Sequence, residues 1–166
     1  MRHTSRSLLL ASLLFAACSS GGGGGGSTTF NAAQQVGTWT GTWTNTTFSS
    51  TGAVTVTVTQ NGDDYTLAFD MDGNVFGGAN PAAENLIASI TTTNATLDAT
   101  TSSVYGTLTG SLNANGTLSA GGTAIPGSVD TFTLTGTWTA TTITANVTIT
   151  FDGGGSANGT ATLTKQ

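Results

Sequence analysis

The chain has 166 residues, with eight acidic and three basic residues, one histidine and one cysteine, and a formal net charge of −5 at pH 7. After residue 18 the only basic residue is Lys165. Such a chain cannot neutralise phosphates, so neither nucleic-acid binding nor docking on anionic lipid head groups is expected. Because the only histidine is His3, a Ser-His-Asp or Cys-His catalytic centre is not expected, nor is an ordinary zinc site.

The first segment of the chain has the features of an export signal. Arg2 and Arg6 precede an apolar run from Leu8 to Ala17, which is too short to span a bilayer. We therefore predict that residues 1–17 are a signal peptide. The alternative that remains open is an ordinary secretory signal with an incidental cysteine after it.

The residues Phe15, Ala16, Ala17 and Cys18 resemble the lipobox of bacterial lipoproteins, with Phe15 where that family usually has leucine. The resemblance implies that Cys18 becomes the lipidated first residue of the mature chain. Membrane attachment would then be permanent, because bacterial lipoproteins carry several acyl chains, whereas a single chain binds only marginally. Ser19 stands where the family often uses Asp to retain proteins at the inner membrane, so delivery to the outer membrane is expected.

A flexible tether is predicted after the cysteine. Residues 18–33 are rich in serine and glycine at their start, and such a chain behaves as a random coil. The eleven residues from 19 to 29 would span roughly 20 Å. Residues 34–166 are expected to form one domain, which is long enough to bury a core.

The domain shows a period of two along most of its length. In "AVTVTVTQ", residues 53–60, valines alternate with threonines, and in "DTFTLTGTWTA", residues 130–140, apolar residues and glycine do the same. Long alternation of this kind predicts antiparallel strands with one dry and one wet face. We expect strands near residues 36–44, 53–60, 64–71, 86–91, 94–100, 104–112, 117–122, 129–139, 142–151 and 157–164.

Short turns separate these runs. The segments "QNGDD", "MDGN", "NANG", "TATT" and "DGGG" have hairpin-turn chemistry, which indicates an up-and-down meander. The predicted fold is all-β, with eight to ten strands closing into a barrel, because closure removes exposed edges; a two-sheet sandwich is the alternative. Glycines on the inner face would allow strongly bent strands: Gly37, Gly41, Gly106, Gly110 and Gly136. The only helix candidate is "NPAAENLI", residues 80–87, whose end could equally begin a strand.

The acidic residues do not form a recognisable site. Asp70, Asp72 and Asn74 have the spacing of a calcium loop, but Val75 and Pro81 stand where an EF-hand requires Gly and an acid. An Asp-Gly hairpin turn is the favoured interpretation, and no metal or other cofactor is expected.

The stretch "QQVGTWTGTWTN", residues 34–45, carries the main family resemblance. Gly37, Thr38 and Trp39 resemble the Gly-x-Trp that begins the first strand of lipocalins and their calycin relatives. In lipocalins a basic side chain from the end of the last strand covers this Trp. The resemblance therefore implies that Lys165 covers Trp39 or Trp43 and closes one end of the barrel, with the Trp residues otherwise serving as core.

The stretch "GTWTN", Gly41 to Asn45, also looks like the first strand of avidin-type biotin binders, whose Asn at this place contacts the ligand. Those proteins place several further Trp residues around the pocket. Beyond Trp39 and Trp43, this chain has only Trp138.

The leading hypothesis is a monomeric, non-enzymatic barrel lipoprotein that binds a small hydrophobic ligand. One alternative is a structural or interaction protein of the cell envelope, with a solid barrel and a Thr-rich outer surface. Another is an integral outer-membrane barrel with apolar residues facing lipid, which short strands and a lipid anchor oppose. The predicted lining of a ligand cavity is Val56, Tyr65, Phe69, Leu108, Phe132, Trp138 and Val147.

Overall fold

The computed structural model describes residues 28–76 and 79–166, and within them the chain forms ten β-strands after one short 3₁₀ helix. The elements are η1 (Ala32–Gln34), β1 (Gly37–Asn45), β2 (Ser50–Asn61), β3 (Asp64–Met71), β4 (Glu84–Ile90), β5 (Asn94–Ser102), β6 (Gly106–Asn113), β7 (Thr117–Thr123), β8 (Val129–Trp138), β9 (Thr142–Phe151) and β10 (Ser156–Lys165). The predicted strands all form, with boundaries shifted by three residues at most. The proposed signal peptide and Cys18 lie outside the described residues.

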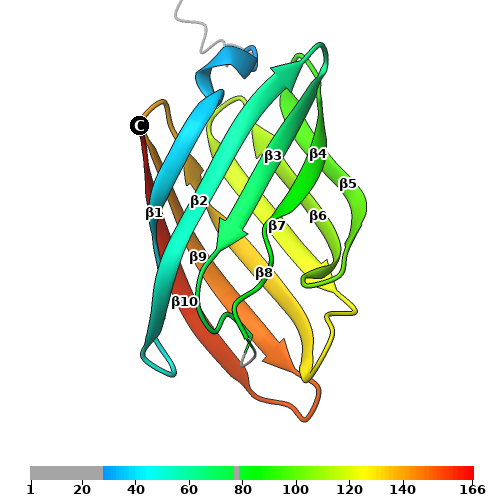
Figure 1. Cartoon of the computed structure of the whole chain (residues 1–166). Helices are drawn as coiled ribbons and strands as arrows, with labels where there is room; N and C mark the ends of the chain where they lie inside the picture. The colour runs from blue at the N-terminus through cyan, green and yellow to red at the C-terminus, as the bar shows by residue number, and fades with distance from the viewer. Residues whose placement is uncertain (1–27, 77–78) are drawn as a thin grey trace, which may run out of the picture.

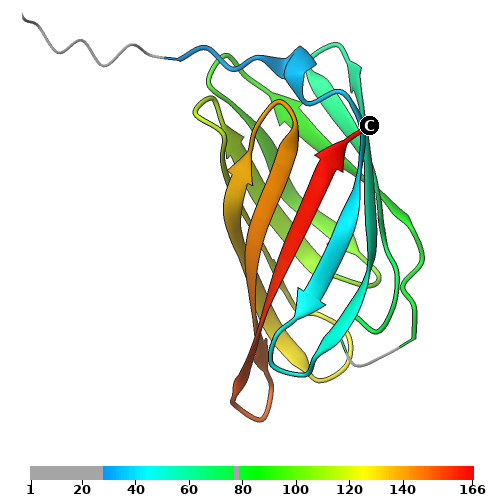
Figure 2. The same cartoon turned by 90° about the vertical axis from the view of Figure 1, so that its left-hand side faces the viewer.

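The strands close into a barrel, as the sequence predicted, and do not form a sandwich (Figures 1 and 2). Each strand pairs antiparallel with its neighbours in sequence, and β1 pairs with β10 to complete the circle. In this last pairing Trp39 lies opposite Lys165, and Asn45 lies opposite Gly159. The barrel is therefore an up-and-down meander whose first and last strands form the closing seam.

Apolar side chains fill the inside and threonines cover the outside. Val54, Val56 and Val58 of β2 are buried, while the threonines between them lie on the other face. Several threonines on neighbouring strands hydrogen-bond across the outer face, as Thr137 and Thr144 do at 3.0 Å. An integral outer-membrane barrel would require the opposite arrangement, with apolar side chains on the outside, facing lipid.

The barrel has two different ends. At the capped end, which is at the top of Figure 1, η1 and the residues before it cross the opening (Figure 2). Phe30 is buried there and its backbone N–H donates to the carbonyl oxygen of Thr92. At the opposite end, here called the loop end, lie the connections β1–β2, β3–β4, β5–β6, β7–β8 and β9–β10.

Three local predictions were wrong. Residues 30–33, assigned to the tether, pack against the capped end, because Phe30 finds an apolar site beside the ring of Tyr65. The helix candidate at residues 80–87 does not form; Glu84–Ile90 is β4, paired with β3. The segment "MDGN" is not a hairpin turn but begins a longer connection between Met71 and Glu84, where Asn80 hydrogen-bonds to Asp72 and Gly73.

The wall has one weak pairing, between β4 and β5. Their register is limited to Ser89 with Thr96 and Ile90 with Ala95, near the capped end. Beyond this point the two strands diverge (Figure 1), and β5 is irregular around Ala99, which has a φ of 28°. The gap in strand pairing therefore extends toward the loop end, between Glu84–Ala88 and Leu97–Ser102.

The described residues contain no helix that is long and apolar enough to cross a membrane.

Closure of the barrel requires a very small residue at Gly41. A Cβ at this position would lie 1.9 Å from the carbonyl oxygen of Thr162 and 2.7 Å from Cα of Leu163. We expect Gly41→Ala to lower the free energy of unfolding by about 2 kcal/mol or more, because the backbone of β10 would have to move. Urea unfolding measures the change. Gly153→Ala is the control, since a Cβ there meets no atom within 4 Å, and equal effects of the two variants would contradict this account.

Candidate functional site: an apolar cavity inside the barrel

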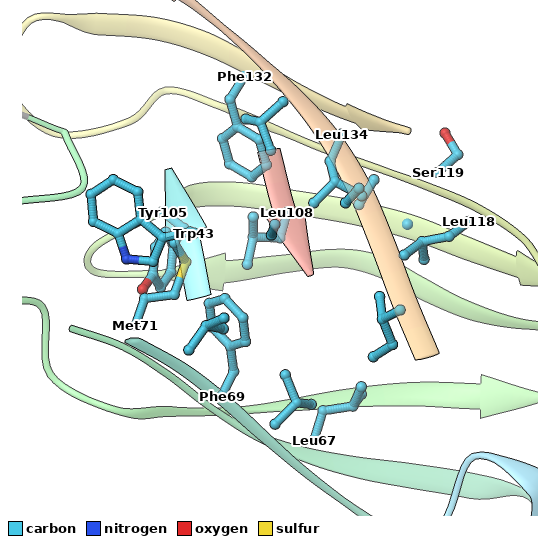
Figure 3. A pocket seen from close by; sticks show the side chains of 18 of the residues that line it. Trp43, Leu67, Phe69, Met71, Tyr105, Leu108, Leu118, Ser119, Phe132 and Leu134 are labelled. Carbon is cyan, nitrogen blue, oxygen red and sulfur yellow. The ribbon is translucent and has the colours of Figure 1, made fainter. Parts of the chain in front are cut away.

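A cavity of about 290 Å³ lies inside the barrel and is partly open to solvent. Side chains from strands around the whole barrel line it, and Figure 3 shows that they converge on the same space. The lining is almost entirely apolar. Among its larger side chains are Trp43, Leu67, Phe69, Met71, Phe76, Tyr105, Leu108, Leu118, Phe132, Leu134 and Trp138.

Six of the seven residues predicted to line a cavity do so in the structure: Val56, Phe69, Leu108, Phe132, Trp138 and Val147. Their alternation with threonine placed them on the inner face. Tyr65 is the exception. It points inward at the capped end, where it is buried against the ring of Phe30 and its hydroxyl donates to the carbonyl oxygen of Ala32. Its role is to fix the N-terminal segment, and it does not line the cavity.

Burial raises the pKa of the Tyr65 hydroxyl from its usual 10.0 to about 12. The neutral phenol is thus favoured in the folded chain, and the stabilisation that it provides is present below pH 10 and is lost as the pH rises toward 12.

Sequence reasoning did not predict two important lining residues. Phe76 belongs to the connection between β3 and β4, outside every predicted strand. Tyr105 falls within the predicted strand at residues 104–112, but its alternation sets it on the face opposite to Leu108; in the structure it lies in the turn between β5 and β6. Their aromatic character is the only signal that the sequence offered. Both rings pack at the loop end, where Tyr105 lies edge-on to Phe69 and Phe76, with centroids 5.5 and 5.9 Å away.

At the capped end the Lys165 ammonium nitrogen lies 5.3 Å from the centroid of the Trp39 ring and donates to the carbonyl oxygen of Gln34 at 2.8 Å. Trp39 is fully buried, and its indole N–H donates to the carbonyl oxygen of Gln35. Its ring meets that of Trp138 edge-on at 5.3 Å. The lysine, the two tryptophans and the segment before β1 thus seal this end.

Trp43 and Asn45 do not belong to this closure. Trp43 lines the cavity nearer the loop end, and its indole N–H donates to the carbonyl oxygen of Asp72. Asn45 borders the cavity, but its side-chain oxygen accepts from the backbone N–H groups of Thr47 and Phe48. Asn45 therefore stabilises the turn between β1 and β2.

Two polar atoms of cavity-lining residues are buried without a hydrogen-bond partner among the described residues: the hydroxyl oxygen of Tyr105 and the indole nitrogen of Trp138. Burial, followed by the nearby carboxylates of Glu84 and Asp70, raises the pKa of the Tyr105 hydroxyl above its usual range. This side chain consequently remains a neutral donor at any physiological pH. Leaving such a group unpaired costs about 1 to 3 kcal/mol.

The cavity therefore offers apolar contacts, together with the hydroxyl of Tyr105 and the indole N–H of Trp138 as hydrogen-bond donors. Within residues 28–76 and 79–166, no three His, Cys, Asp or Glu side chains come together in a way that could hold a metal ion. Glu84 does not line the cavity; its carboxylate accepts from the exposed Ser103 hydroxyl at 3.2 Å.

No protein-family model and no curated protein matches the sequence. Among solved structures, the barrel is similar to Rv2717c from M. tuberculosis, with 12% identity and a TM-score of 0.50, over 81% of this chain and 94% of that one. It is also similar to a protein of unknown function from the DUF3598 family of Nostoc punctiforme, with 9% identity and a TM-score of 0.58. That match covers 83% of this chain but only half of the Nostoc chain. At these identities the likeness shows the fold alone.

The contacts of Lys165 predict a measurable contribution to stability. We expect Lys165→Met to lower the free energy of unfolding by about 1 to 2 kcal/mol, because it removes the contact with Trp39 and the hydrogen bond to Gln34. It should also alter the tryptophan fluorescence spectrum. Thermal unfolding and fluorescence measure these effects. The control is Gln166→Met, at the exposed neighbouring residue; if Lys165→Met changed neither observable, the closure would contribute nothing.

Proposed function

We propose that this protein is an exported, lipid-anchored and non-catalytic barrel that binds a small hydrophobic ligand in its interior. The observation that carries the binding function is the cavity of about 290 Å³ with its apolar lining. Ligand pockets typically range from about 300 to 1,000 Å³, so the ligand would be small. Burial of its apolar surface would supply the affinity, at about 25 cal/mol for each Å² removed from water.

The proposal that the protein acts without catalysis is supported by its residue types. The only histidine is His3 and the only cysteine is Cys18, and both precede the domain. The cavity wall itself consists of aliphatic and aromatic side chains with a few hydroxyl groups, an amide and glycines. Such a wall can bind and shield a ligand, whereas acid-base or nucleophilic catalysis needs groups that it does not supply.

Lipid anchoring is supported by the sequence of residues 1–29. An apolar signal leads to a lipobox-like "FAAC", and the Ser/Gly run that follows is long enough to hold the barrel clear of a membrane. Residues 28–31 lead into η1 at the capped end (Figure 2). The capped end would therefore face the anchor. The outer membrane of the cell envelope is the proposed location.

A structural or interaction role in the envelope is the second candidate. It is favoured by the small size of the cavity and by the two clusters of buried side chains, one that includes Trp39 and one that includes Val129. In this case the outward threonines would form the functional surface.

Filling the cavity distinguishes the two functions. We expect Ala161→Phe to reduce the affinity for an apolar probe such as decanol about tenfold or more, because Ala161 lines the cavity next to Trp43. Thr162→Phe, the control at the exposed neighbouring position, should leave the affinity unchanged. Titrations that follow tryptophan fluorescence measure binding, and circular dichroism verifies folding. Equal affinities for Ala161→Phe and the unmodified chain would contradict ligand binding in the cavity.

The anchor has its own test. The unmodified full chain, expressed in a bacterium that processes lipoproteins, should remain with the membrane in high salt and dissolve only in detergent. Cys18→Ser should release it into the soluble fraction, because no acyl chain can be attached. Extraction of the unmodified chain by high salt alone would contradict the lipid anchor.

A further inference from the structure

We propose that the cavity selects an uncharged ligand, one that carries a hydrogen-bond acceptor for the hydroxyl of Tyr105 and no carboxylate. This inference rests on the proposed binding function and specifies the chemical class of the ligand. Three features of the described residues carry it: the position of the basic side chain, the position of Glu84, and the unpaired hydroxyl of Tyr105.

No cation is available to pair with an anionic ligand in the cavity. After residue 18 the only basic residue is Lys165, and its ammonium group lies at the capped end, over Trp39 and on the carbonyl oxygen of Gln34. Lys165 does not line the cavity. A carboxylate buried among the lining side chains would therefore lose its hydration without gaining a counter-ion, which is strongly unfavourable.

The carboxylate of Glu84 would add electrostatic repulsion of an anionic ligand to this cost. Glu84 stands opposite Phe69 in the pairing of β4 with β3, so the two side chains share the inner face of the barrel. The Glu84 carboxylate is held by the Ser103 hydroxyl beside Tyr105. Its charge acts on the hydroxyl of Tyr105, whose ring packs against those of Phe69 and Phe76. An anionic head group near Tyr105 would meet a like charge.

The hydroxyl of Tyr105 favours a ligand that carries a hydrogen-bond acceptor. Its side chain lines the cavity and is 4% exposed, and its hydroxyl has no hydrogen-bond partner within the described part of the chain. The atoms that cover the hydroxyl offer it no hydrogen bond. A ligand oxygen that displaces them would satisfy the donor and remove the cost of burying it unpaired. An ester, ketone, ether or alcohol oxygen fits, since each accepts without a charge.

The two tyrosines form a natural pair for testing this assignment. The hydroxyl of Tyr65 is used within the protein, on the carbonyl oxygen of Ala32, whereas that of Tyr105 is not. In the ligand-free protein, Tyr65→Phe should therefore lower the thermal midpoint, and Tyr105→Phe should leave it unchanged or raise it. A lower midpoint for Tyr105→Phe than for Tyr65→Phe would overturn the assignment.

The ligand class is tested with four probes that share a decyl chain: decane, decanol, decanoate and decylamine. Binding to the purified full chain at neutral pH is followed by tryptophan fluorescence, since Trp43 and Trp138 line the cavity. We expect the folded chain to bind decanol about tenfold or more tightly than decanoate. It should also bind decanol more tightly than decylamine, because the ammonium group has no lone pair that could accept from the Tyr105 hydroxyl. Glu84→Gln should reduce the preference for decanol over decanoate about threefold or more.

Tyr105→Phe should weaken decanol binding about two- to tenfold, in line with the loss of one hydrogen bond, and leave decane binding unchanged. Tyr65→Phe should leave both affinities unchanged. Decanoate or decylamine binding as tightly as decanol would overturn the inference but leave the binding function standing. Absence of binding by all four probes would overturn both.

Discussion

The pairing of β1 with β10 is the constraint on which the rest of this structure depends. It joins the two ends of the meander and removes both free edges. It is possible because Gly41 lets the backbone of β10 approach to a distance that no side chain would permit. The same pairing sets Lys165 opposite Trp39, so the closing of the barrel wall and the sealing of its capped end follow from one register.

Closure also determines what the interior can do. Once the sheet is curled, the alternation of each strand sends its apolar residues inward and its threonines outward. The side chains fill the capped end but leave a cavity toward the middle of the barrel. The strands β4 and β5 share only two residue pairs, and the part of the wall where they are unpaired lies beside this cavity, near Glu84 and Tyr105. We propose that this interior holds a small uncharged molecule.

The sequence predicted the fold well because its signal was simple. Strict alternation in segments such as Val54 to Val58 determines which face is buried, and register then follows from the short turns. The same alternation identified most of the cavity lining. It could not show that the Tyr65 hydroxyl is occupied by Ala32, or that Phe76 and Tyr105 complete the loop end, since each of these contacts involves a residue outside the strands. The sequence "NPAAENLI" has the start signals of a helix, but pairing of Glu84–Ile90 with β3 overrides them.

The central claim is that the barrel carries a small uncharged molecule. Native mass spectrometry of the protein purified from its own cells in mild detergent tests it most directly, because a ligand held in an apolar cavity is retained when the fold is retained. The account predicts a second species of constant added mass, from which unfolding releases a neutral, lipid-soluble compound that contains oxygen. A single species with the mass of the lipidated polypeptide alone would contradict it, as would a released fatty acid.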